Sequence, residues 1–347
     1  MQIYDENGYV DIKKILSLNI PFTIVVGGRA TGKTYTTLKT VIEEGICFMY
    51  MRRLQSQCDL INKPEFSPFK VLNQDMHWHI GVSAISKYNA GFYNMVMDSE
   101  NGKMITEGKP LGYSCALSTI SNMRGFDASD VQLLIYDEFI HEKHERDLKN
   151  EGDAFLNAYE TMNRNRELKG QKPLQCILLA NSTNMANPIF MSLGLVRIAD
   201  KMKKIHNTVY INNKRGIALF MLDDSPISKQ KADTVLYRLT ENTEFSRMSL
   251  ANEFSVEEIG KVKSQQLKLY KPLVIVGELC IYSHKSEHSY YCSTHKSGNP
   301  EEYGSGYAEL TRFRKKYYWL WQREYMDNNI IFEEYICQIL FEQYFKV

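Results

Sequence analysis

The chain has 347 residues, which is long for one compact domain, because single cores tend to split beyond about 250 residues. Apolar residues make up 44% of it and charged residues 24%, so the composition favours neither a disordered nor a fibrous protein. The 42 Lys and Arg residues nearly balance the 41 Asp and Glu residues, and the molecule as a whole therefore has no field that would attract DNA or an anionic membrane from a distance. Any contact with nucleic acid must come from local patches.

The cysteines and the N-terminal sequence indicate a cytoplasmic protein. The seven cysteines are odd in number and scattered, and several lie inside apolar runs such as GICFMYM and LQCILLA, as expected of reduced, buried thiols. The N-terminus has early acidic residues and no apolar signal segment. No later run approaches the ~18 apolar residues of a membrane-spanning helix. We expect neither export nor a membrane partner.

Predicted strands and helices alternate in the first two thirds of the chain. Four apolar runs have the length and composition of strands covered on both faces, as in a parallel sheet: FTIVVGG, ICFMYMRR, VQLLIYDEF and LQCILLANS. Helical stretches lie between them, including TYTTLKTVIEE and DAFLNAYETMNRNRELK. This alternation predicts an α/β fold with a mainly parallel sheet flanked by helices.

The last third of the chain has a different texture. Residues 223–233 are polar and include a proline, which favours a linker, and from about residue 261 short apolar runs separated by turn residues predict a small antiparallel meander. Two predicted helices follow, AELTRFRKKYYWLWQREYMD and IFEEYICQILFEQYF. We therefore predict a first domain over residues 1–225, a linker over 226–255 and a small α+β domain over 256–347.

The stretch GGRATGKT fits the phosphate-binding pattern G-x-x-x-x-G-K-[ST] and lies directly between a predicted strand and a predicted helix. Its glycines let backbone N–H groups turn toward phosphate oxygens, Lys33 would neutralise those oxygens, and Thr34 would offer its hydroxyl to Mg²⁺. A glycine turn with only a structural role is the alternative. The whole loop is predicted to bind a nucleotide: Gly27, Gly28, Arg29, Ala30, Thr31, Gly32, Lys33 and Thr34.

Two carboxylates end the apolar run LLIYDE about a hundred residues downstream. Asp137 would hold the Mg²⁺, and Glu138 would polarise the attacking water as a base. An isolated Asp-Glu pair at a strand end is more often a solvated helix cap, but the phosphate-binding loop upstream favours the catalytic interpretation. A base beside the metal-binding carboxylate suits ATP hydrolysis better than transfer to a small acceptor.

Polar residues near the next predicted strand are weaker candidates. Asn181 ends that strand, where its side chain would reach the γ-phosphate or the attacking water, or would only cap a turn. Arg164 and Arg166 lie near the end of the preceding predicted helix. An arginine there would reach the γ-phosphate of a neighbouring subunit, or would only favour the helix dipole. The residues alone leave these alternatives open.

Several segments resemble the DNA-packaging ATPases of phi29-like tailed phages, relatives of the large terminase motors: GGRATGKT, FMYMRR, LLIYDEFI, NRNRE, LLANS and TEFSRMSLANEF. The match is collinear from about Ile24 to Phe190 and returns near Thr243. The resemblance implies an ASCE-type P-loop domain that hydrolyses ATP with Mg²⁺. It also implies a ring, pentameric by family expectation, at the portal of an empty procapsid in the host cytoplasm, where it pulls in double-stranded DNA. A packaging RNA as a further partner, and a monomer in isolation, stay open.

The resemblance also assigns roles to single positions. The phosphate-binding loop and the two carboxylates keep the roles given above, and Arg29 matches a basic residue within the loop. Arg164 matches a finger that acts on the neighbouring subunit, with Arg166 as the fallback. Asn181 falls in the coupling motif of the family. Arg124 falls where the family has a basic residue proposed to act on DNA or on the neighbouring subunit.

Little of the C-terminal region aligns with the family. Large terminases have an RNase H-like nuclease there, whose chemistry needs a cluster of carboxylates that holds two metals. The strand-like runs LVIV and LCIYS contain no acidic residue. We therefore expect a reduced, inactive version of that domain, similar to the one in phi29-like phages.

The first C-terminal helix has an aromatic face and a basic band. Phe313, Tyr317, Leu320 and Trp321 fall on one side at helical spacing and are predicted to form core rather than a platform for stacking bases. Four basic residues lie outside this face and are candidates for contact with nucleic acid or the portal: Arg312, Lys315, Lys316 and Arg323.

The sequence therefore predicts a ring-forming, ATP- and Mg²⁺-dependent DNA translocase that packages a phage genome. Hydrolysis would use Glu138 in cis and Arg164 in trans. The alternatives are a nuclease-competent large terminase, a P-loop kinase and a non-hydrolysing, nucleotide-gated assembly factor. Their marks are metal-dependent DNA cutting, phosphate transfer to an acceptor, and tight ATP binding without phosphate release.

Overall fold

A computed structural model describes residues 3–123, 127–141, 145, 148–181, 187–222, 225–241, 243 and 262–345. The chain divides into two compact units, the first made of Met1–Asn184 and Met202–Phe254, the second of Met185–Lys201 and Ser255–Val347. The domain borders expected at residues 225 and 255 stay predictions. Residues 185–201, which we expected in the first domain, group with the second unit.

Nine strands form one sheet in the described part of the first unit, in the order β3-β4-β5-β2-β6-β7-β1-β9-β8. Strand β1 (Phe22–Gly27) pairs in parallel with β7 (Gln175–Asn181) and β9 (Ile217–Leu222). Strand β7 separates β1 from β6 (Leu133–Asp137), which is the ASCE order. The remaining strands are β2 (Phe48–Arg52), β3 (Ile80–Ala84), β4 (Ala90–Met97), β5 (Met104–Ala116) and β8 (Val209–Asn212).

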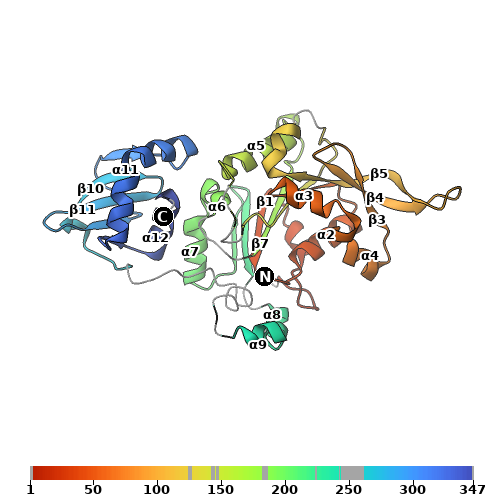
Figure 1. The fold of residues 1–347 in the computed structure, drawn as a ribbon, viewed down its shortest axis with the longest axis horizontal. Helices are drawn as coiled ribbons and strands as arrows, with labels where there is room; N and C mark the ends of the chain where they lie inside the picture. The colour runs from red at the N-terminus through yellow and green to blue at the C-terminus, as the bar shows by residue number, and fades with distance from the viewer. Residues whose placement is uncertain are drawn as a thin grey trace. The chain divides into compact units, whose positions relative to one another are not determined.

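The four predicted strands of this sheet are confirmed. Strands β1, β2, β6 and β7 are buried along nearly their whole length, as expected where helices cover both faces of a parallel sheet. Antiparallel pairing is confined to the two edges, where β3 pairs with β4, β4 with β5, and β8 with β9. Strands β4 and β5 extend past the rest of the sheet as a two-stranded hairpin (Figure 1).

Helices connect these strands, and their ends follow from local chemistry. Helix α2 (Lys33–Glu43) begins after Gly32, whose φ of 80° lies in the left-handed region. Helix α5 (Glu151–Asn163) ends earlier than the sequence pattern predicted, because Arg164 has φ 50° and ψ −138° and cannot continue the helix. Further helices are α1 (Ile12–Leu16), α3 (Gln55–Ile61), α4 (Lys70–Met76), α6 (Pro188–Ser192) and α7 (Val196–Lys204), with 3-10 turns at Pro64–Phe66, Leu117–Met123 and Glu167–Lys169.

The stretch expected to be a linker contains two short helices. These are α8 (Pro226–Ala232) and α9 (Val235–Leu239), and both group with the first unit. Proline at the first position of α8 suits a helix start, since the N–H it lacks would have had no partner in the helix. Residues 226–232 and 235–239 of the predicted linker are therefore helical.

The second unit is built on five strands in the order β13-β10-β11-β12-β14 within its described residues. The predicted meander is confirmed, with β11 (Leu279–His284) antiparallel to both β10 (Tyr270–Val276) and β12 (Tyr290–Ser293). Two three-residue strands extend it by parallel pairing, β13 (Glu301–Tyr303) to β10 and β14 (Ile330–Phe332) to β12. A 3-10 turn lies at Leu267–Leu269.

Helices α11 (Tyr307–Met326) and α12 (Tyr335–Phe345) lie beside this sheet (Figure 1). The aromatic face predicted for α11 is core. Phe313 and Trp321 are fully buried, and the Trp321 ring meets Tyr290 edge to face at 4.8 Å. Tyr317 and Leu320 are half-buried at the margin of the same face.

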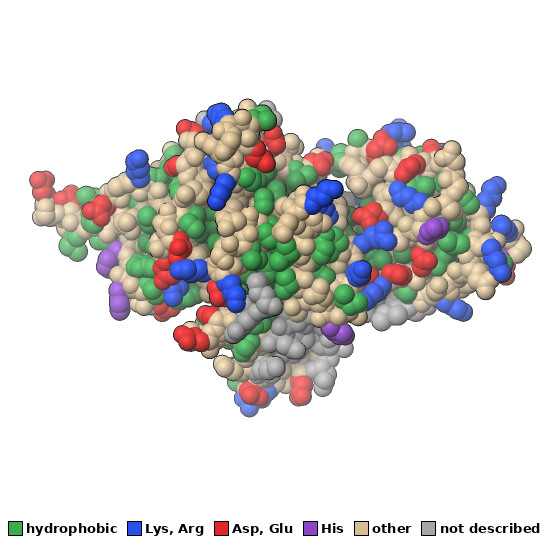
Figure 2. All heavy atoms as spheres, turned by 180° about the vertical axis from the view of Figure 1, so that it is seen from behind, with side chains coloured by type: hydrophobic (Ala, Val, Ile, Leu, Met, Phe, Trp, Pro, Cys, Tyr) green, Lys and Arg blue, Asp and Glu red, His purple; other side chains and the backbone are tan. Residues whose placement is uncertain are grey.

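The formal net charge of the chain is close to zero. On the face drawn in Figure 2, basic and acidic side chains lie intermixed, in keeping with a formal net charge of +1. Across the part of the chain that the structure describes, no helix combines the length and apolar character needed to cross a bilayer.

Candidate active site

The phosphate-binding loop encloses the side chain of Lys33. Its Nζ donates hydrogen bonds to the carbonyls of Gly27 (3.1 Å) and Gly28 (2.7 Å) and to Thr31 Oγ1 (3.2 Å). Only 8% of Lys33 is exposed. Burial lowers the pKa of Lys33 to about 8, although nearby carboxylates act in the opposite direction. The site therefore holds a cation at a desolvation cost that an anionic ligand would offset.

The backbone of this loop is fixed by an N-terminal segment. Val10 N–H donates to the Thr31 carbonyl at 3.0 Å. A Cβ added to Gly32 would come within 2.5 Å of the Tyr9 side chain, and the φ of Gly32 is also positive, so only glycine fits there. Ala30 has φ 63° as well. Two positive φ values close together let a loop turn its N–H groups toward one point.

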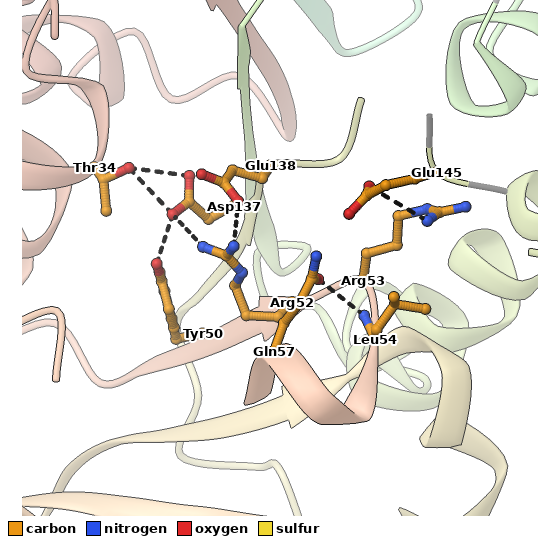
Figure 3. Close-up of polar contacts among 9 residues, drawn as sticks. All are labelled: Thr34, Tyr50, Arg52, Arg53, Leu54, Gln57, Asp137, Glu138 and Glu145. Carbon is orange, nitrogen blue, oxygen red and sulfur yellow. Dashed lines mark hydrogen bonds and ion pairs between the residues drawn. The ribbon is translucent and has the colours of Figure 1, made fainter. Parts of the chain in front are cut away.

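Asp137 lies buried at the end of β6, where three side chains donate to it (Figure 3). Thr34 Oγ1 lies 3.0 and 3.1 Å from its two carboxylate oxygens, Tyr50 Oη lies 2.5 Å away, and Arg52 Nη1 lies 3.3 Å away. Burial and the neighbouring Asp137 charge raise the pKa of Tyr50 well above its usual range, so its phenol stays a donor. A hydroxyl and a carboxylate side by side are oxygen ligands of the kind that Mg²⁺ takes.

Glu138 follows Asp137 in a strained backbone conformation. Its φ is 55°, a conformation that is costly for a residue with a Cβ and is found preferentially at functional sites. Arg52 Nη2 pairs with Glu138 Oε2 while Arg52 Nη1 contacts Asp137. About half of the Glu138 side chain, 53%, is exposed. This carboxylate is therefore partnered on one side and open to solvent on the other.

The contributions of Tyr50 and Arg52 were missed from the sequence. Both lie on β2, two positions apart, so their side chains leave the strand on the same side. Our sequence analysis used the segment FMYMRR as a predicted strand and as part of the family resemblance, and gave neither side chain a role. Their spacing of two positions at the end of a predicted strand is a sequence signal that both side chains lie on one side, but the pairing of this strand with β6 is known only from the structure.

Asn181 reaches the same site from β7. In the parallel pairing of β1 with β7, Gly27 lies opposite Asn181, and Lys33 Nζ lies 3.3 Å from Asn181 Oδ1. A cavity of about 380 Å³ opens above these groups and is lined by Arg29, Ala30, Thr31, Gly32, Lys33, Thr34, Tyr35, Asp137, Glu138, Ala180 and Asn181. Most of the predicted nucleotide-site residues thus meet at one edge of the sheet.

The two candidate finger residues differ in their surroundings, and neither lines this cavity. Arg166 Nη2 donates to the carbonyls of Ala128 (3.1 Å), Ser129 (3.4 Å) and Val131 (2.7 Å), which is a structural arrangement. Arg164 is half exposed and pairs with exposed Asp127 at 3.3 Å. Its backbone has a positive φ of 50°.

Comparison with known proteins identifies the family of this chain. Residues 4–269 match the family described as Podovirus DNA encapsidation protein (Gp16). The chain belongs to this family. The DNA packaging proteins of Bacillus phages PZA and phi29 are each 26% identical to it over 255 residues, which span 72% of this chain and 67% of theirs. The family resemblance seen in the motifs is thereby confirmed.

A solved structure is similar in fold to nearly the whole chain. The structure described as the Phi-28 gp11 DNA packaging motor matches with a TM-score of 0.63 at 20% identity and covers 99% of both chains. The fold similarity therefore includes the second unit, where our sequence comparison had aligned almost nothing.

Two further predictions concern Arg124 and the basic band of α11. Arg124 lies outside the described residues. In the basic band of α11, most side chains have acidic neighbours: Arg312 with Glu309, Lys316 with Glu301 and Arg323 with Glu324. The band is exposed as predicted, but these carboxylates reduce the positive field that it presents.

Proposed function

We propose that this encapsidation protein is an ATP hydrolase whose turnover drives double-stranded DNA into a procapsid. The observation that carries the proposal is the meeting of Lys33, Thr34, Asp137, Glu138 and Asn181 around one cavity. These residues come from the start of α2 and from the ends of β6 and β7, which are far apart in sequence. Buried charged groups that converge in a cavity are costly to fold and are typical of catalytic sites.

The nucleotide phosphates would lie along the loop over residues 27–34, with Lys33 as the neutralising cation. Thr34 and Asp137 would hold Mg²⁺, which supplies charge stabilisation to phosphate oxygens when bound. Glu138 would orient and deprotonate the attacking water, since its carboxylate is next to the cavity and half exposed. Asn181, within hydrogen-bond reach of Lys33, would report the state of the phosphate chain to β7.

Arg164 would act on the nucleotide of a neighbouring subunit. Its exposure, its surface partner Asp127 and its absence from the lining of its own cavity favour a role outside its own site. Arg166, engaged with three carbonyls, is better suited to fix the loop over residues 128–131. A ring of head-to-tail subunits gives every site one such neighbour.

The partners of this ring follow from the family. Double-stranded DNA would be held through phosphates without sequence readout, at the portal of a procapsid in the host cytoplasm, with a pentamer as the expected ring. The phosphates of a packaging RNA would contact a further group of basic residues, for which the α11 band is the candidate. We propose no nuclease activity, because β10 and β11 contain no carboxylate and the two carboxylates of β13, Glu301 and Glu302, are paired with Lys316 and Lys296.

ATP turnover with and without double-stranded DNA tests this proposal. We expect DNA to stimulate wild type. Glu138→Gln should still bind a fluorescent ATP analogue but release phosphate about 10²- to 10⁴-fold more slowly. The matched control is Glu302→Gln, the same change at an exposed pair with Lys296, which should turn over normally. Tight binding without turnover in wild type would instead indicate the assembly factor, and metal-dependent DNA cutting would indicate a working nuclease.

A further inference from the structure

Two consecutive arginines at the end of β2 leave the chain on opposite sides. Figure 3 shows Arg52 directed at Asp137 and Glu138, and Arg53 directed away from them toward Glu145. Arg52 is the last residue of β2, and Arg53 is the first residue beyond it. Arg52 belongs to the nucleotide site, whereas Arg53 belongs to a second cluster of charges.

That second cluster is centred on a buried ion pair between Arg53 and Glu151. Arg53 Nε lies 2.8 Å from Glu151 Oε1, and each side chain is only 1% exposed. The same carboxylate accepts from Tyr136 Oη at 3.2 Å and from the Leu148 N–H at 3.2 Å. Glu145 lies 3.8 Å from Arg53 Nη1. The carboxylate of Glu151 thus connects β2, β6 and the start of α5.

Stability alone gives little reason for this pair. The cost of removing two charges from water is often as large as the attraction between them, and apolar residues of similar size commonly replace such pairs without loss. The pair instead fixes the position of the two side chains, because the donors of a planar guanidinium group point in fixed directions. The element whose position it fixes is helix α5.

Helix α5 connects this ion pair to the candidate finger. Glu151 is its first residue, and Arg164 follows its last. Thirteen residues make a rod about 20 Å long. Phe155 on this helix stacks against Tyr136 with ring centroids 5.6 Å apart, and Asn163 Oδ1 accepts the Leu174 N–H at 2.7 Å. A shift at the Glu151 end would therefore move Arg164.

We propose that the Arg53–Glu151 ion pair is a positioning device for the finger: it sets helix α5 so that Arg164 reaches the site of the neighbouring subunit. The inference rests on the proposed function of Arg164. Neither Arg53 nor Glu151 lines the nucleotide cavity, so the pair acts on the neighbour's reaction through α5.

The variant for the test removes both charges together, Arg53→Met with Glu151→Leu, because removal of one partner alone would leave an unpaired buried charge. A second variant, Glu151→Asp, keeps the charge and shortens its reach. The matched control is Asp153→Asn, an exposed carboxylate in the same turn of α5. Thermal melting establishes that each full-length variant is folded. We expect the double variant and Glu151→Asp to lose about 100-fold in DNA-stimulated ATP turnover, as a misplacement near 1 Å does, and the control to lose none.

Mixed subunits then assign the defect. Combined with Glu138→Gln, which contributes an intact Arg164, the double variant should recover turnover. Combined with Arg164→Ala, it should not, because no subunit then has a working finger. Wild-type turnover of the folded double variant, or recovery with Arg164→Ala but not with Glu138→Gln, overturns the positioning role. If Glu138→Gln and Arg164→Ala themselves fail to complement each other, the trans finger fails and this inference falls with it.

Discussion

The nucleotide site and the exposed side of helix α11 are both rich in charged residues, but they partner their charges differently. In the site, the pairs join residues far apart in sequence, Thr34 with Asp137 and Arg52 with Asp137, and the shared carboxylate is buried. On α11, Arg312 pairs with Glu309 three residues away, and both side chains are exposed, at 67% and 37%.

The difference teaches how to weigh charge in this chain. Exposed neighbours on one helix pair at little cost and contribute little, so their presence says nothing about function. Buried charges on separate strands lower the free energy of unfolding because they lose contact with water. Such a cluster therefore indicates a functional site. The Arg312–Glu309 pair of the basic band is of the first kind. The carboxylates at the end of β6 are of the second kind.

The largest expected effect comes from the metal-binding carboxylate. Asp137→Asn should lower ATP turnover roughly 10³-fold, because the charge stabilisation attributed to a bound metal is worth several kcal/mol. The measurement is steady-state phosphate release at saturating Mg²⁺. Glu302→Gln in the second unit is the control and should retain full turnover. A comparable loss in both variants would erase the distinction between the two regions.

Removal of the buried lysine should stabilise the nucleotide-free protein. Below pH 8 Lys33 is charged in the folded protein, where burial deprives it of water. The lowering of its pKa from 10.5 to about 8 corresponds to a loss of about 3 kcal/mol in the free energy of unfolding. Lys33→Met removes this cost. Because the unfolded lysine keeps its proton up to pH 10.5 and the folded one only to about 8, the advantage of the variant should disappear between these values. Urea unfolding at pH 7 and pH 10 measures it. An equal difference at both pH values would contradict the assigned shift.

Replacing each of the two candidate finger arginines by glycine should change the free energy of unfolding in opposite directions. Arg164→Gly relieves a backbone conformation that only glycine adopts freely, and should raise the free energy of unfolding by about 1 kcal/mol. Arg166→Gly removes the donor to three carbonyls and should lower it by about 1–3 kcal/mol. Urea unfolding of the two variants side by side is the measurement. The same sign in both would mean that the two positions are not distinguished as we describe.

The smallest effect is expected on the exposed side of the second unit. The pKa of Glu301 is lowered to about 2, mainly by Lys316, with help from Tyr303 and Tyr317. Glu301→Gln should therefore lower the unfolding midpoint slightly at pH 7, and the difference should disappear as pH falls from 4.5 to 2, where the wild-type carboxylate also becomes neutral. Added salt should weaken the effect at pH 7. A large, salt-independent loss would place this pair among the buried ones.

Much of the fold and the core of the site could be predicted because their signals are local. An apolar run predicts a strand, and the residues that end it, GGRATGKT or Asp137 and Glu138, predict the chemistry at the end of that strand. Asn181 was reachable for the same reason. The two three-residue strands of the second sheet were not predicted, since a strand of that length exists only through its partner.

The remaining features depend on register and long-range packing, which periodicity does not encode. The parallel pairing of β2 with β6 brings Arg52 to Asp137 and Glu138, and the sequence gives no sign of that pairing. Arg164 and Arg166 looked alike as residues. The structure separates them by the positive φ of Arg164 and its exposed pair with Asp127, and by the three carbonyls around Arg166.

Complementation between two inactive subunits tests the central claim most directly. Glu138→Gln and Arg164→Ala are each assayed alone, and then as an equimolar mixture, for DNA-stimulated ATP turnover. The account predicts that both are inactive alone and that the mixture recovers activity, since about one interface in four pairs an intact Glu138 with an intact Arg164 in a head-to-tail ring. A mixture no more active than its components, or an Arg164→Ala subunit that hydrolyses ATP normally, would contradict the shared active site.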